Sequence, residues 1–195
     1  MKYFFLMLFL ATTSHAAADE RQQSIALFIA VDRSLSMESE FAAVQQYLAG
    51  YIVDRLLHPG DFLLVAAFYG QAQVIIAQEI SGGRDKDAVK NSILGMHADG
   101  RFTDIGNAID LVATQMELYQ ADPRKKYVML VTDSLQEAPL PSRYYNEAGV
   151  LSHGLLEYSR TIEMGSWRIV NLGVATKQMA SEYADQIWSV LSDRE

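Results

Sequence analysis

Two almost wholly apolar segments, each followed directly by an aspartate, constrain the fold of this chain more than any other feature. Residues 24–31 precede Asp32, and residues 127–132 precede Asp133. Apolar runs that are continuous rather than alternating are typical of strands covered on both faces of a parallel sheet. Because function in such sheets lies at the carboxyl ends of the strands, we expect both aspartates on one functional rim.

The rest of the chain alternates amphipathic helices with further strands. We expect strands at 61–69, 72–80 and 167–174, and helices at 37–57, 85–96, 105–119, 148–162 and 181–191. The strands at 61–69 and 72–80 are expected to form an antiparallel hairpin, and Gly165 to cap the helix at 148–162. This order predicts an α/β fold: a three-layer sandwich with a Rossmann-like, mostly parallel sheet and helices on both faces. No sixth strand is recognisable after Val174.

The amino-terminal residues have the pattern of a secretory signal peptide. Lys2 is followed by nine apolar residues at 3–11 and by a short segment that ends in small residues at Ala16 and Ala18. Nine apolar residues are too few to cross a membrane, which requires roughly twenty in a helix. We therefore expect a signal peptide at 1–18 and a single domain at 19–195, secreted or periplasmic in a bacterium, with no membrane span after cleavage.

Composition excludes several classes of function. The chain has no cysteine, so disulfides, thiolate zinc sites, iron–sulfur clusters and thiol nucleophiles are ruled out. It has 16 Lys and Arg against 24 Asp and Glu, a net charge of −8, and no basic block, which argues against a nucleic-acid partner. The G-x-S-x-G motif of serine hydrolases and the phosphate-loop and G-x-G-x-x-G nucleotide motifs are also missing.

Oxygen-bearing side chains cluster where the two apolar strands end. Ser34 and Ser36 follow Asp32 closely, and Thr103 stands in the loop before the helix at 105–119. Together with Asp133 they supply three hydroxyls and two carboxylates, the ligands that Mg²⁺ or Mn²⁺ prefers. The alternative for the Asp32–Ser36 segment is helix capping, for which Ser36 before Met37 is well suited. The set of five favours a metal site.

These motifs resemble those of the von Willebrand factor A (vWA) family. The D-x-S-x-S motif at 32–36, Thr103 in T-D-I-G-N-A-I and Asp133 in L-V-T-D stand in the order of the family's metal-ion-dependent adhesion site, or MIDAS. The resemblance covers essentially the whole expected mature chain and implies the vWA fold, with strand order 3-2-1-4-5 for the strands recognised. It implies that Ser34, Ser36 and Thr103 are hydroxyl ligands of the metal, and that Asp32 and Asp133 act directly or through water.

The resemblance further implies a metal-dependent protein-binding module rather than an enzyme, with a glutamate or aspartate of an unknown partner protein completing the coordination. Two features depart from the family pattern. Ser134 stands where the family usually has glycine, and residues 134–145 form a longer, proline-containing segment. Because of these two differences, the family pattern does not predict the shape of the partner-binding rim.

Three alternatives remain at the level of sequence. A haloacid-dehalogenase-like phosphotransferase would use Asp32 as nucleophile, but it needs a second acid two residues on, where this chain has Ser34. A structural vWA domain with an idle metal site is the second. The third alternative concerns a local feature, the segment of Arg143, Tyr144 and Tyr145. Its tyrosines either pack on the domain or form an aromatic anchor for a partner beside the metal.

Overall fold

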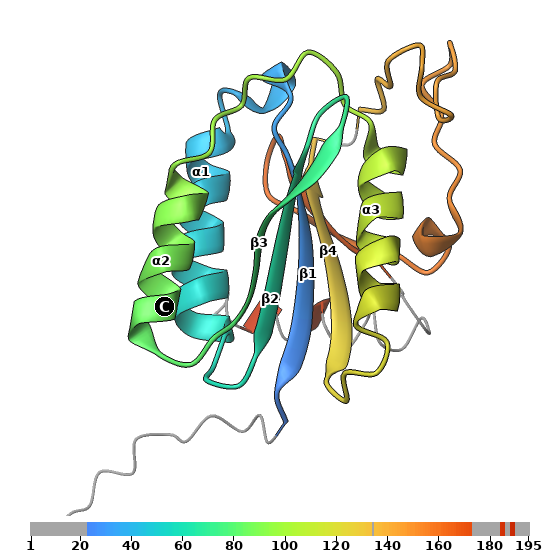
Figure 1. The fold of residues 1–195 in the computed structure, drawn as a ribbon. Helices are drawn as coiled ribbons and strands as arrows, with labels where there is room; N and C mark the ends of the chain where they lie inside the picture. The colour runs from blue at the N-terminus through green and yellow to red at the C-terminus, as the bar shows by residue number, and fades with distance from the viewer. Residues whose placement is uncertain (1–22, 134, 173–183, 186–187, 190–195) are drawn as a thin grey trace, which may run out of the picture.

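The computed structural model describes residues 23–133, 135–172, 184–185 and 188–189. These residues form a six-stranded sheet with the order β3-β2-β1-β4-β6-β5, flanked by helices (Figure 1). The strands are β1 (Ile25–Asp32), β2 (Phe62–Phe68), β3 (Ala72–Glu79), β4 (Lys125–Thr132), β5 (Arg160–Glu163) and β6 (Arg168–Leu172).

The centre of the sheet is parallel and its outer pairings are antiparallel. Strand β1 lies between β2 and β4 and pairs in parallel with both. The hairpin of β2 and β3 is antiparallel, as predicted, and β6 pairs with β4 in the antiparallel direction. The predicted strand order is confirmed, with the strand expected at 167–174 present as β6.

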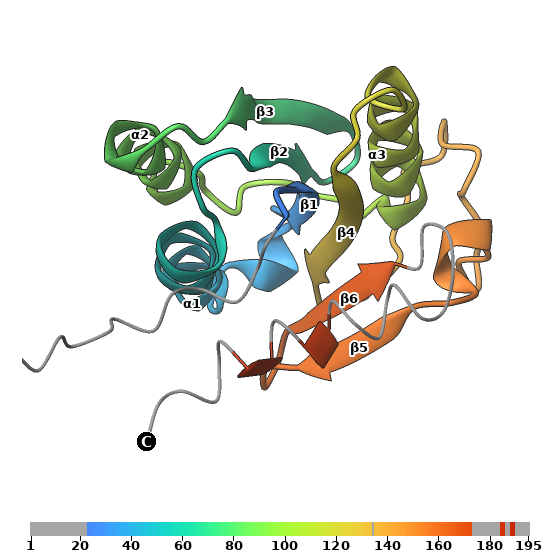
Figure 2. The same ribbon diagram turned by 90° about the horizontal axis from the view of Figure 1, so that it is seen from below.

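Helices cover both faces of the sheet, which confirms the three-layer α/β sandwich (Figure 2). A short 3₁₀ turn, η1 (Leu35–Met37), leads into α1 (Phe41–Gln46), which continues as the π-wound η2 (Tyr47–Leu56). These and α2 (Gly83–Leu94) lie on one face, and α3 (Ile105–Leu118) lies on the other. The apolar stripe predicted for the first helix is buried, including Val44, Leu48 and Ile52.

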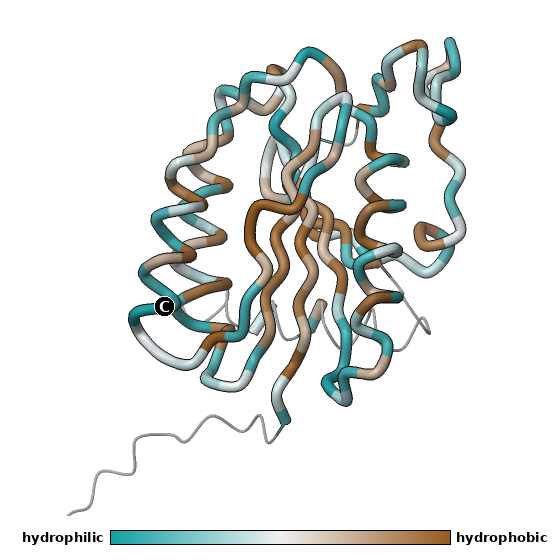
Figure 3. The backbone as a smooth tube through the Cα atoms, in the orientation of Figure 1, coloured by the Kyte–Doolittle hydropathy of each residue, from teal (hydrophilic) through white to brown (hydrophobic). Residues whose placement is uncertain are grey.

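The two layers enclose separate hydrophobic cores. Residues of β1 alternate between them: Leu27 and Ile29 pack toward α1 and η2, whereas Phe28 packs toward α3. All eight residues of β1 are buried, as expected for a strand covered on both faces. Figure 3 shows hydrophobic residues along the central strands and more hydrophilic ones at the loops.

The prediction of a helix at 148–162 is wrong. This stretch is irregular apart from the short 3₁₀ helix η3 (Gly154–Leu156), and it ends in strand β5. The apolar residues that suggested a helical stripe face different cores: Leu155 packs on the α3 side, whereas Ile162 packs on the α1 side. Gly149 has a φ of +61°, a conformation that interrupts a right-handed helix.

The sheet also has a sixth strand that the sequence reading did not find. Strand β5 precedes β6 and pairs with it as an antiparallel hairpin. The turn is closed by a 2.9 Å hydrogen bond from the Met164 amide to the Trp167 carbonyl. Gly165, expected to cap a helix, instead occupies this turn with a φ of +94°. The sheet therefore continues beyond β6 by one strand.

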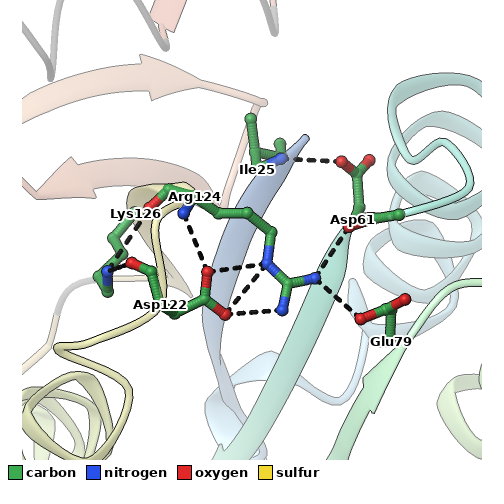
Figure 4. Close-up of polar contacts among 7 residues, drawn as sticks. Ile25, Asp61, Glu79, Asp122, Arg124 and Lys126 are labelled. Carbon is green, nitrogen blue, oxygen red and sulfur yellow. Dashed lines mark hydrogen bonds and ion pairs between the residues drawn. The ribbon is translucent and has the colours of Figure 1, made fainter. Parts of the chain in front are cut away.

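At the lower end of the sheet, a charged network joins three strands (Figure 4). The Arg124 guanidinium donates to both carboxylate oxygens of Asp122, to the Gly60 carbonyl at 2.8 Å, and to Glu79 at 3.3 Å. Nearby, the Asp61 carboxylate accepts from the amide of Ile25 at 2.9 Å, at the start of β1. These contacts hold the lower ends of β1, β2 and β3 together with the chain entering β4.

Two expectations fall mainly on residues that the structure does not describe. The signal peptide at 1–18 lies outside the described residues, as does most of the helix expected at 181–191. Among the residues described, no helix has the length and hydrophobicity to span a bilayer.

Candidate functional site

The candidate site begins with Asp32, the last residue of β1. Its side chain is fully buried. One carboxylate oxygen accepts from the Ser34 amide at 2.8 Å and the other from the Thr132 hydroxyl at 2.6 Å. The parallel register of β1 and β4, in which Val31 lies opposite Val131, brings Asp32 beside Thr132. The carboxylate is thereby fixed by donors from two neighbouring strands.

Burial makes the charged form of Asp32 costly. Desolvation raises the pKa of this carboxyl to about 6, against hydrogen bonds from Thr132 and Ser34 that lower it. The negative charge of Asp133 raises the pKa of Asp32 further. Within the described residues Asp32 makes no ion pair with a cationic side chain. A cation near Asp32 would favour its ionised form.

The two serines lie beside this carboxylate with their hydroxyls together. The Ser34 and Ser36 Oγ atoms are 3.0 Å apart, with Ser34 buried and Ser36 exposed. Oxygens in adjacent positions of an octahedral Mg²⁺ site, each about 2.1 Å from the metal, lie about 3.0 Å from one another. Ser36 lies within η1 and does not precede it, and Ser34, at the cap position, forms no side-chain cap, so the structure gives no support to the capping alternative for either serine. The two hydroxyls hydrogen-bond to each other, and their separation equals that of two neighbouring oxygens around one Mg²⁺ ion.

A backbone bridge joins the serine loop to the loop that precedes α3. The Leu35 amide donates to the Gly100 carbonyl at 2.7 Å, and the Gly100 amide donates to the Arg33 carbonyl at 2.9 Å. A Cβ at position 100 would lie 2.2 Å from the Cβ of Tyr69. Only glycine therefore permits this approach.

A second bridge joins Thr103 to the segment after β4. Thr103 is buried and exchanges two backbone hydrogen bonds with Glu137, at 3.0 and 2.8 Å. Half-buried Asp133 stands at the end of β4, where it accepts from the Leu135 amide at 3.2 Å. The three loops that carry the five predicted ligands are thus tied together at the upper end of the sheet, where Figure 1 shows the loop between α2 and α3 crossing the end of β1.

The donor set is rich in hydroxyls and poor in charge. No group of three or more His, Cys, Asp or Glu side chains able to hold a metal occurs among the described residues. The predicted set has two carboxylates and three hydroxyls, so it belongs to a different class of site. Its oxygen chemistry suits a hard divalent cation.

The three residues predicted for a partner-binding rim lie in different environments. The Tyr144 ring packs on α3 at Gly106, where a Cβ would lie within 2.3 Å of the ring. The Arg143 guanidinium forms an ion pair with Asp110 of α3 and a 2.7 Å hydrogen bond to the Tyr144 hydroxyl. Tyr145 is 43% exposed. Of the two tyrosines, Tyr144 therefore packs on the domain and Tyr145 is the more exposed.

Sequence reasoning missed three residues that shape the site. Thr132 orients Asp32, and Gly100 allows the loops to meet. The Gln136 side-chain carbonyl accepts from the Ile105 amide at 2.9 Å, at the start of α3. Thr132 could have been found by aligning the two apolar segments at their terminal aspartates, because β1 and β4 pair in parallel. No local sequence pattern marks Gly100 or Gln136.

Comparisons with known proteins give distant relatives. A protein of Treponema pallidum (strain Nichols), described as uncharacterized, is 26% identical over 173 residues, covering 88% of this chain and 78% of that protein. A von Willebrand factor type A structure from Catenulispora acidiphila is 21% identical, with a TM-score of 0.43, over 53% of this chain and 25% of that one. An aerotolerance-related membrane protein of Bacteroides fragilis NCTC 9343 is 20% identical, with a TM-score of 0.47, over 60% and 57% of the two chains.

The match to a family is more direct. Residues 27–136, which run from β1 through α3 to the segment beyond β4, match the von Willebrand factor type A domain. This range includes all five predicted metal-ligand positions and more than half of the chain. The chain belongs to the von Willebrand factor type A domain family.

Proposed function

We propose that this domain binds Mg²⁺ or Mn²⁺ through Ser34, Ser36, Thr103, Asp32 and Asp133, and that it binds an acidic residue of a partner protein through the metal. The observation that carries the proposal is the pair of serine hydroxyls 3.0 Å apart beside the buried Asp32 carboxylate. Family membership supports it, because the range that matches the family includes all five residues, and their pattern resembles the family's adhesion-site motif.

Each residue has a defined task in this proposal. Ser34, Ser36 and Thr103 offer neutral oxygens, and the Ser34 amide and the Thr132 hydroxyl hold Asp32 in a fixed orientation. Asp32 and Asp133 supply the negative charge, directly or through water. A divalent cation held mainly by neutral oxygens keeps enough positive charge to bind a carboxylate from outside the chain.

The proposal is of a binding module and not of an enzyme. A phosphotransferase that used Asp32 as nucleophile would need a free carboxylate oxygen, yet both oxygens accept hydrogen bonds and the side chain is fully buried. Position 34 also carries a serine rather than the second acid that such chemistry requires. These observations favour the adhesion-type site over the phosphotransferase.

The proposed location is outside the cytoplasm of a bacterium. The apolar run at 3–11 behind Lys2, followed by small residues at Ala16 and Ala18, supports export by a cleaved signal peptide. Amino-terminal sequencing of the protein recovered from the periplasm would test this. We expect the sequence to begin at Asp19.

Metal binding is tested by titrating the purified protein with Mn²⁺ and following free Mn²⁺ by electron paramagnetic resonance. We expect saturable binding that Ser34→Ala and Asp133→Ala each reduce at least tenfold. Asp87→Ala is the matched control, because Asp87 is an exposed aspartate on α2. Unchanged Mn²⁺ binding in both site variants would overturn the proposal, and binding lost in the control as well would point to nonspecific attraction to the acidic surface.

A further inference from the structure

A cavity of about 700 Å³ opens at the upper end of the sheet, next to the candidate metal site. Its apolar walls are the rings of Tyr69, Phe102, Pro139 and Pro141. Its volume lies in the range of pockets that bind ligands, about 300–1,000 Å³. The cavity is large enough to receive more than one side chain of a bound protein segment.

The wall of this cavity and the metal site share the same stretch of backbone. Phe102 and Asp104 line the cavity and flank the predicted ligand Thr103. The Asp104 amide donates to the Tyr69 carbonyl at 2.7 Å, which fixes this stretch against the end of β2. A partner segment whose carboxylate reached the metal would therefore have its neighbouring side chains beside the cavity.

The charged groups in the cavity wall are held by contacts within the protein. The Asp104 carboxylate is almost fully buried and caps α3 by accepting from the Asn107 amide at 3.0 Å. Asp110 forms an ion pair with Arg143. Asp110 is thus already engaged by Arg143, and the Asp104 carboxylate is too buried to reach an entering side chain easily. An apolar side chain would instead meet the rings of Tyr69 and Phe102.

We propose that the cavity is a specificity pocket for an aromatic or large aliphatic side chain, carried by the partner segment whose acidic residue binds the metal. Phe102, which lines the cavity next to Thr103, is 43% exposed. Aromatic side chains supply large apolar area and stack on such rings. This inference rests on the proposed metal-dependent function, and it adds the chemistry of the partner.

The test uses short blocked peptides as probes, titrated into the ¹⁵N-labelled protein with saturating Mg²⁺ and followed by NMR. One peptide contains a single aspartate among glycines. Others add a tryptophan, or instead a lysine, at each of the three positions on either side of the aspartate, and a last set replaces the aspartate of the tryptophan peptides by asparagine. We expect tryptophan at one spacing to tighten binding about tenfold over the aspartate–glycine peptide, the effect of burying part of a large apolar side chain. Amide shifts are expected at Gly70 and Asn107.

Phe102→Ala should remove this tenfold gain while leaving the affinity of the aspartate–glycine peptide unchanged. Leu118→Ala is the matched control, because Leu118 is an exposed apolar residue at the far end of α3. The inference is overturned if the aspartate–glycine peptide binds with Mg²⁺ but tryptophan adds nothing at any spacing, if lysine is preferred, or if Phe102→Ala leaves the gain intact. Failure of the proposed function itself gives a different result: no peptide shows Mg²⁺-dependent binding, and Mn²⁺ does not bind in the metal titration.

Discussion

At the lower end of the sheet Arg124 lies between Asp122 and Glu79, whereas at the upper end Asp32 is buried with only hydroxyl and amide donors among the described residues. The consequences for the two carboxyl groups are opposite. Hydrogen bonds from Arg124 lower the pKa of Asp122, and burial raises the pKa of Asp32 to about 6. Two aspartates thus differ: the anionic form is stabilised in Asp122 at the lower end and destabilised in Asp32 at the upper end.

This difference separates a structural network from a candidate binding site. In the lower network the Arg124 charge is paired within the chain, and its hydrogen bonds join the ends of β2, β3 and β4 (Figure 4). At the upper site, burial and the nearby charge of Asp133 both disfavour the charged form of Asp32. A chain that leaves such charges without a cationic partner among its described residues is suited to receive a cation from solution.

The largest loss of stability is expected for Arg124→Ala. The change removes the hydrogen bonds to Asp122, Gly60 and Glu79 and the contact of the guanidinium with the Phe62 ring, 5.6 Å from its centroid. We expect the free energy of unfolding, measured with urea, to fall by about 2–3 kcal/mol. Mn²⁺ affinity should not change.

Two controls sharpen this first prediction. Arg124→Lys keeps the positive charge but loses the two-pronged contact, so it should have a smaller effect. Arg84→Ala removes an exposed arginine of α2 and should change the free energy of unfolding by less than about 0.5 kcal/mol. Equal losses from the changes at positions 124 and 84 would mean that the lower network adds nothing beyond a surface charge.

The second prediction is that Asp32→Asn stabilises the protein when no metal is present. Because the folded state holds the Asp32 proton more tightly than the unfolded state, the contribution of Asp32 to stability falls as pH rises from about 4 to about 6. With a chelator at pH 7, the variant should be about 1–3 kcal/mol more stable than the wild type. The gain should vanish below pH 4, where the carboxyl is protonated in both states.

Urea unfolding across this pH range measures the effect, with Asp99→Asn as the exposed control. Asp99 pairs with Arg33 near the same rim, and its side chain is 63% exposed, so a small effect is expected there. A destabilising Asp32→Asn at pH 7 would contradict the idea that Asp32 is strained as an anion. The same variant should bind Mn²⁺ more weakly, so that stability and metal binding change in opposite directions.

The third prediction concerns the packing that holds the segment after β4 against α3. Gly106→Ala would place a Cβ within 2.3 Å of the Tyr144 ring, so we expect the free energy of unfolding to fall by about 1–2 kcal/mol. In a Tyr144→Ala background the clash is gone, and the same change should stabilise α3 by up to about 1 kcal/mol. A change of the same sign in both backgrounds would show that Tyr144 does not lie over Gly106 in solution.

The sequence predicted the centre of the molecule well and its carboxyl-terminal part poorly. Strands β1 and β4 contain long apolar runs that are buried in the sheet, and such runs are readily recognised as central strands. Recognising them also predicted that Asp32 and Asp133 lie on one rim. The stretch before β6 misled because Leu155 and Ile162 have helical spacing but pack into different cores. Within the site, Gly100 and Gln136 act through contacts between distant loops, which no local pattern reveals.

The smallest effect on stability is expected for Ser36→Ala. The Ser36 hydroxyl is exposed and contacts only the Ser34 hydroxyl among the described residues, so its loss should change the free energy of unfolding by less than about 0.5 kcal/mol. If Ser36 is a metal ligand, Mn²⁺ affinity should nevertheless fall several-fold. Ser39→Ala, three residues further on and also exposed, should change neither quantity.

Arg124→Ala and Ser36→Ala would then form a matched pair, because the first alters stability without metal affinity and the second alters metal affinity without stability. A Ser36→Ala variant with full Mn²⁺ affinity would remove this hydroxyl from the site and reduce the proposed metal ligands to the buried oxygens and Asp133.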